Sequence, residues 1–79
     1  MRVIAEIPHS HFKIQIFSWN GKYQLKIEID QYEQTYKVSE TNVKGLDDVK
    51  ALITEDFLSK VMGRMISMRE DWNEALKSI

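Results

Sequence analysis

The chain has 79 residues, with 11 Lys and Arg, 12 Asp and Glu, a formal net charge of −1, no Cys and 43% apolar residues. The apolar fraction excludes a disordered chain, and no apolar run approaches the roughly 20 residues of a membrane-spanning helix. The net charge argues against a general polyanion binder but is compatible with a local basic patch. The lack of Cys excludes disulfides, thiolate nucleophiles and all-Cys zinc sites. We therefore expect one soluble, cytoplasmic domain over residues 1–79 that is not associated with a membrane.

The first three expected strands lie around one proline and one turn signal. A strand from Arg2 to Ile7 ends at Pro8, which cannot donate a backbone hydrogen bond to a neighbouring strand. Two more strands flank Asn20 and Gly21, because this dipeptide favours the positive φ angles of a type I′ hairpin turn. One face of this hairpin is apolar and pairs Ile16 with Leu25, Ile14 with Ile27, and Phe12 with Ile29. The other face pairs Trp19 with Lys22, Phe17 with Gln24, Gln15 with Lys26, Lys13 with Glu28, and His11 with Asp30. We expect the apolar face to be buried.

A fourth strand is expected from Tyr32 to Val38, where Tyr32, Tyr36 and Val38 alternate with Glu33, Thr35 and Lys37. The connections between the four strands are too short for parallel crossovers. An antiparallel meander in chain order is therefore the simplest arrangement.

After Gly45 the apolar residues recur with a period of about 3.6, which indicates helices. A short helix within Leu46 to Ile53 is followed by a break, because Thr54 is suited to be the N-cap of a longer helix from about Glu55 to Ser78. The apolar stripe of the longer helix consists of Phe57, Leu58, Val61, Met65, Met68, Trp72, Ala75, Leu76 and Ile79. The fold class is thus α+β, a four-stranded antiparallel β-meander with one face covered by a C-terminal helical region, a short helix and then a long one.

The long helix has more apolar surface than one small sheet readily covers. A helix of this length extends ~36 Å, and its stripe stays apolar to the final residue. The stripe either closes the core of its own chain or packs against a second copy, since small chains often complete their cores by symmetric pairing. The second interpretation predicts a homodimer with an interface of Met65, Met68, Trp72, Leu76 and Ile79.

The polar face of the hairpin is the candidate binding surface, and its residues are Phe17, Trp19, Lys22, Gln24, Lys26 and Lys13. Exposed aromatic rings stack on bases and Lys neutralises phosphates, so this face suits a single-stranded nucleic acid as well as a protein partner. Alternatively, the two aromatic rings pack against each other, a Lys stem or the first strand. Four strands followed by a helix resemble PUR-repeat and Whirly proteins in predicted topology, and those families bind single strands through their sheets and often dimerise.

No group of residues has the pattern of an active site. His9 and His11 could join Asp30 in a metal site, but a cross-strand pair between His11 and Asp30 is the simpler interpretation. The carboxylates cluster at helix N-termini, where the helix dipole accounts for them, and no catalytic triad or phosphate loop is present. We therefore predict a non-enzymatic interaction module without metal or cofactor, which forms a homodimer and binds a protein partner. Weak binding of single-stranded nucleic acid is the alternative.

Overall fold

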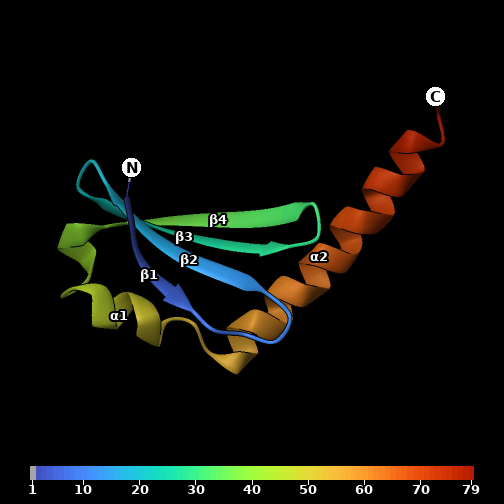
Figure 1. Cartoon of the computed structure of the whole chain (residues 1–79). Helices are drawn as coiled ribbons and strands as arrows, with labels where there is room; N and C mark the ends of the chain where they lie inside the picture. Colours follow the sequence, from blue (N-terminus) through green and yellow to red (C-terminus); the bar gives the residue numbers. More distant parts are fainter. Residues whose placement is uncertain (1) are drawn as a thin grey trace.

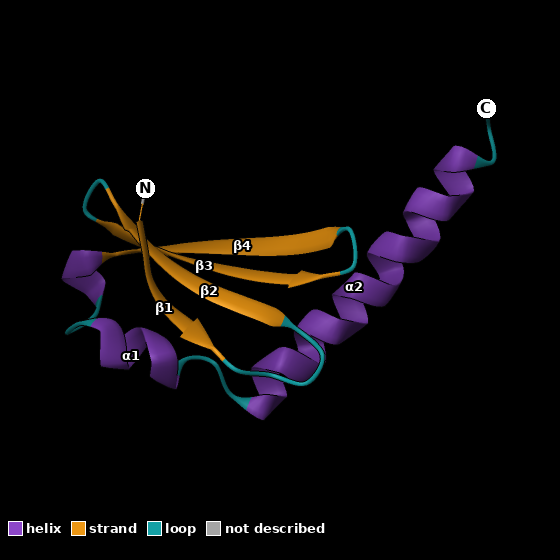
Figure 2. Cartoon of the chain, viewed as in Figure 1, coloured by secondary structure: helices purple, strands orange, loops and turns teal. Residues whose placement is uncertain are grey.

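The strands and helices follow one another in the predicted order. The computed structural model describes residues 2–79, and its elements are β1 (Arg2–Ile7), β2 (Lys13–Trp19), β3 (Lys22–Ile29), β4 (Tyr32–Ser39), the short 3₁₀ helix η1 (Glu40–Asn42), α1 (Leu46–Ala51) and α2 (Glu55–Leu76). The strands form one antiparallel sheet in the order β1-β2-β3-β4. Both helices lie on one side of this sheet (Figure 1 and Figure 2). The predicted α+β meander is confirmed.

The register between β2 and β3 is the one that the Asn20-Gly21 turn predicts. Both turn residues have positive φ angles, 54° for Asn20 and 74° for Gly21. The pairs run from Trp19 with Lys22, through Ile16 with Leu25 and Ile14 with Ile27, to Lys13 with Glu28.

The predicted continuation of this ladder to Phe12–Ile29 and His11–Asp30 is not formed. Asp30 has a φ of 54° and begins the turn into β4, so it leaves the strand direction. On the other side, residues 8–12 form a loop that is organised by His9, whose Nδ1 accepts hydrogen bonds from the backbone N–H groups of His11 at 3.1 Å and Phe12 at 3.3 Å. The Phe12 side chain is nevertheless buried, as expected.

β1 pairs with β2 through an interrupted ladder. The register shifts between Val3 and Ala5, so that Val3 pairs with Phe17 whereas Ala5 pairs with Ile16. Because successive strand residues point to opposite faces, this shift turns Ala5 and Ile7 towards the helices. Ile4, Ala5 and Ile7 pack against the core as partly buried residues.

The core lies between the sheet and the two helices. Its buried members are Phe12, Ile14, Ile16, Leu25 and Ile27 from the sheet region, with Val49, Leu58, Val61 and Met65 from the helices. Ile16, Ile27 and Val61 have no solvent exposure. The buried face of the hairpin is thus the predicted one, and Ile29 and Phe57 join it as partly buried residues.

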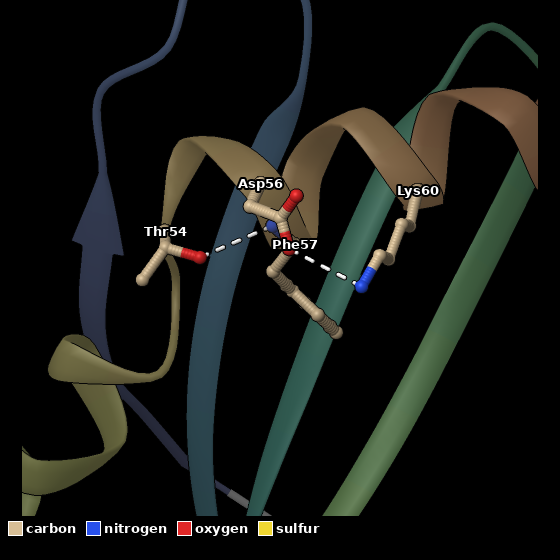
Figure 3. Close-up of polar contacts among 4 residues, drawn as sticks. All are labelled: Thr54, Asp56, Phe57 and Lys60. Atoms are coloured by element: carbon tan, nitrogen blue, oxygen red, sulfur yellow. Dashed lines mark hydrogen bonds and ion pairs between the residues drawn. The ribbon is translucent and has the colours of Figure 1, made fainter.

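The break before α2 is stabilised by a side-chain cap. Thr54 Oγ1 accepts a hydrogen bond from the backbone N–H of Phe57 at 3.1 Å, which confirms the predicted N-cap (Figure 3). One turn further along, Lys60 Nζ lies 3.2 Å from Asp56 Oδ2 on the solvent side. The cap fixes the direction in which α2 starts across the sheet.

α2 runs alongside β4 in the opposite direction and then leaves the sheet. From its start to its end it meets progressively earlier residues of β4, in the order Phe57 beside Tyr36, Arg64 beside Gln34, and Trp72 beside Tyr32. Its last turns project beyond the turn that joins β3 to β4 (Figure 1). We call Trp72, Leu76 and Ile79 the C-terminal tip. Their exposed fractions are 50%, 43% and 99%.

Candidate interaction surfaces

The side of the sheet opposite the helices carries the predicted binding residues, and we call it the open face. The register places on it Val3 and Glu6 of β1, Lys13, Gln15, Phe17 and Trp19 of β2, Lys22, Gln24, Lys26 and Glu28 of β3, and Glu33, Thr35 and Lys37 of β4. Phe17, Trp19, Lys22, Gln24, Lys26 and Lys13 therefore lie on one surface, as the hairpin register requires.

The two aromatic residues of the open face differ in exposure. Trp19 lies beside Lys22 at the hairpin turn and is 54% exposed. Phe17 is half-buried between its strand neighbours Val3 and Gln24. The open face thus offers one freely accessible ring, and the contact of Phe17 with β1 follows the alternative considered from the sequence.

Charges on the open face largely compensate one another. Lys26 Nζ lies 3.2 Å from Glu33 Oε2, and Gln15 Nε2 donates a hydrogen bond to Glu6 Oε1 at 3.1 Å. The face carries four lysines (Lys13, Lys22, Lys26 and Lys37) and three glutamates (Glu6, Glu28 and Glu33). The uncompensated positive charge lies towards the Asn20-Gly21 turn, where Lys22 neighbours Trp19.

The residues predicted for a dimer interface fall into two groups. Met65 is 3% exposed and belongs to the core of its own chain, while Met68 packs partly against that core. Met65 is buried because α2 still lies over the sheet at that point, so a second copy could not reach it. The C-terminal tip does not belong to the core. At its start, Trp72 lines a shallow hollow at the end of the sheet, together with Gln31, Tyr32, Met68 and Asp71.

Hydrogen bonds of polar side chains connect α2 to β4, and the sequence did not predict them. Gln34 pairs with Ile27 and therefore lies on the face of the sheet that carries the helices. Its Nε2 donates a hydrogen bond to the backbone carbonyl of Val61 at 3.1 Å, and its Oε1 accepts one from Arg64 Nε at 3.0 Å. Arg64 also donates to the Tyr36 hydroxyl at 2.9 Å. One feature of the sequence does point to this network. Gln34 is a polar residue between Tyr32 and Tyr36 on the face of β4 that is otherwise apolar.

A second unpredicted surface is the groove between the outer edge of β4 and α2. Its lining residues are Gln34, Thr35, Tyr36, Arg64, Ser67, Met68 and Asp71. Residues of β4 form one wall, and residues of α2 form the other. The sequence alone could not show it, because it depends on where α2 lies relative to β4.

The two histidines stabilise a loop. His9 accepts two backbone hydrogen bonds through Nδ1, and its ring centroid lies 5.1 Å from that of Phe12 and 5.8 Å from that of His11. Within residues 2–79, His11 forms no ion pair with Asp30, and no three His, Cys, Asp or Glu residues come together as a metal site would require.

Comparison of this chain with family models, curated proteins and solved structures found no match. Among residues 2–79, no helix combines the length and apolar character needed to cross a membrane. The case for function therefore depends on the surfaces described above.

Proposed function

We propose that this protein is a non-enzymatic interaction module that forms a homodimer through its C-terminal tip and binds a protein partner. The observation that carries the proposal is the exposure of Trp72, Leu76 and Ile79 in the last turns of α2, where the helix passes the end of its own sheet. Large apolar side chains grouped beyond the core are typical of contact surfaces, and aromatic residues supply much of the energy at such contacts. The interface begins after Met65 and includes Met68 at its margin.

The test is the molecular mass in solution. Sedimentation equilibrium at micromolar concentration should give the mass of a dimer for the original protein and a shift towards monomer for Trp72→Ala. Trp72 is half-exposed, so its truncation leaves no cavity in the core of its own chain. Asn73→Ala is the matched control on the same part of α2, and it should leave the mass unchanged. A monomeric original protein at that concentration contradicts self-association.

Single-stranded nucleic acid is the second candidate ligand, and the exposure of Trp19 beside Lys22 favours it. An exposed ring can stack on a base, with a contribution of about 1–3 kcal/mol. The pairing of Lys26 with Glu33 leaves few free cations, so we expect weak binding at physiological salt.

Titration with an unstructured oligonucleotide at low salt tests this second candidate. In a Trp72→Phe background, Trp19 is the remaining tryptophan, and its fluorescence should be quenched as the oligonucleotide binds. Absence of quenching at tens of micromolar removes nucleic acid as a ligand. Binding that falls with added salt, by a log-log slope near −0.7 per neutralised phosphate, supports it.

A further inference from the structure

β4 forms a regular outer edge of the sheet. Its ladder with β3 is continuous from Tyr32 to Ser39, with neither a proline nor a register shift. Proteins usually protect such edges with proline, bulges, charged side chains or a covering element, because unpaired backbone groups bind other strands. Of these devices β4 has the charged side chains Glu33 and Lys37, which restrict binding to strands of complementary charge. β1, at the opposite edge, has the register shift between Val3 and Ala5 and is followed by Pro8.

The register shows which backbone groups of β4 are free. Ile29 and Tyr32 flank the two-residue turn at Asp30 and Gln31, so they form a hydrogen-bonded pair. Backbone groups alternate in direction along a strand, and those of Glu33, Thr35 and Lys37 therefore point away from β3. These three residues offer a row of donors and acceptors along the outer edge of β4, and Thr35 among them lines the groove.

The β4 edge has opposite charges at its two ends, and they lie on both sides of the sheet. Lys37 lies at one end of the β4 edge, and Arg64 reaches the neighbouring Tyr36 hydroxyl at 2.9 Å. Glu33 lies towards the other end, and Asp71 follows Arg64 by two helical turns in the direction of the β3–β4 turn, because α2 runs opposite to β4. Lys37 and Glu33 lie on the open-face side of the β4 edge, where Glu33 also pairs with Lys26, whereas Arg64 and Asp71 lie on the helix side. On both sides the edge is basic near Tyr36 and acidic near Glu33.

We propose that an extended segment of a protein partner binds this groove as a fifth strand. The segment is acidic where it meets Lys37 and Arg64 and basic where it meets Glu33 and Asp71. Main-chain hydrogen bonds supply affinity in this mode of recognition, and side-chain charges select the register. A second copy of the chain fits less well, because it would bring its own α2 against the α2 that forms the groove wall. The site is separate from the C-terminal tip and from Trp19, so it adds a function to those proposed above.

A synthetic peptide with the sequence of residues 31–39 is a suitable probe, because it lacks a helix and carries the required charges. Bound antiparallel with its central residue opposite Thr35, it places its own Glu opposite Lys37 and its own Lys opposite Glu33. The chain contains no Cys, so Thr35→Cys creates a single thiol at the centre of the edge. The same substitution in the peptide, with its sulfur activated as an aromatic mixed disulfide, allows exchange when the two strands pair: the protein thiolate attacks the peptide sulfur and the aromatic thiolate leaves. Opposed strand residues lie within disulfide range.

The experiment measures the rate of mixed-disulfide formation between protein and peptide. The protein carries Trp72→Ala, so that self-association through the C-terminal tip does not contribute to the rate. Thr35→Cys protein should capture the peptide about tenfold faster than it captures a peptide in which Glu and Lys are exchanged. Lys13→Cys, on the open face but inside the sheet, is the matched control protein and should capture both peptides slowly. Equal rates for the two peptides, or equal rates at positions 35 and 13, overturn the proposal. The mass measurement on the original protein is independent of this result.

Discussion

Arg64 and Gln34 join helix and sheet at the outer edge of the fold, with Arg64 Nε donating to Gln34 Oε1 at 3.0 Å. The same Gln34 side chain donates to the Val61 carbonyl on α2. α2 contacts the sheet mostly through one apolar stripe. The hydrogen bonds of Gln34 to Val61 and Arg64 therefore help to set how α2 is rotated about its own axis. The position of the groove beside β4 depends on that rotation.

Gln34→Ala should therefore destabilise the protein by about 1–2 kcal/mol, because Arg64 and Tyr36 lose a shared acceptor in a partly buried site. Arg64→Ala should cost less, since Arg64 is exposed to solvent. Urea unfolding of the two single variants and the double variant measures their coupling. Additive losses would show that the hydrogen bond between them does not stabilise the fold.

Replacement of Ile27 tests the core. Ile27→Ala should lower the free energy of unfolding by about 2–5 kcal/mol, because the residue has no solvent exposure and its truncation leaves a cavity. Lys26→Ala, the neighbour that points to the open face, should cost at most about 1 kcal/mol, since its partner Glu33 is half-exposed. Similar losses for the two variants in chemical denaturation would contradict the assigned faces of β3.

The cap at Thr54 should be worth about 1 kcal/mol to the fold. Thr54→Ala removes the acceptor for the Phe57 N–H, whereas Thr54→Ser keeps it and serves as the control. Thermal unfolding followed by circular dichroism should show a lower midpoint for the alanine variant and a nearly unchanged one for serine. Equal midpoints for the two variants would indicate that a water molecule accepts the Phe57 N–H hydrogen bond in the alanine variant without loss of stability.

Replacement of Gly63 by alanine should stabilise the fold. A Cβ atom at this helical position would meet no atom within 4 Å, so Gly63→Ala fits the structure without strain. The free energy of unfolding should rise by about 0.5–1 kcal/mol, because alanine has the higher helix propensity. Met62→Ala is the opposite control, since Met62 packs partly against the core and its truncation should destabilise. A loss of stability in Gly63→Ala would reveal a close contact at this site that the single chain lacks.

Local patterns predicted most of the fold. Asn20 and Gly21 determine the β2–β3 register through their backbone preference, and Thr54 marks the start of α2 through one hydrogen bond to its own helix. Both signals lie within a few residues of the structure they specify. The hairpin face with Trp19 and Lys22 followed from the same register.

The interactions between distant segments were not predictable in this way. Gln34 meets Val61 and Arg64 only because α2 lies along β4, and no local preference determines that course. The end of the β2–β3 ladder was missed for a related reason, since Asp30 takes its positive φ in the turn to β4 and His9 organises the loop on the other side. The apolar stripe also places Met65 in the predicted interface, because the sequence pattern does not show where α2 leaves the sheet.

The register shift between Val3 and Ala5 also limits where other strands can join this sheet. A sheet with two regular borders can add strands on both sides, and molecules of that kind can join end to end into fibres. Here the β1 border is irregular and ends at Pro8, whereas the β4 border is regular. Strand addition is therefore confined to the β4 border, and one molecule cannot link two others through both borders of its sheet.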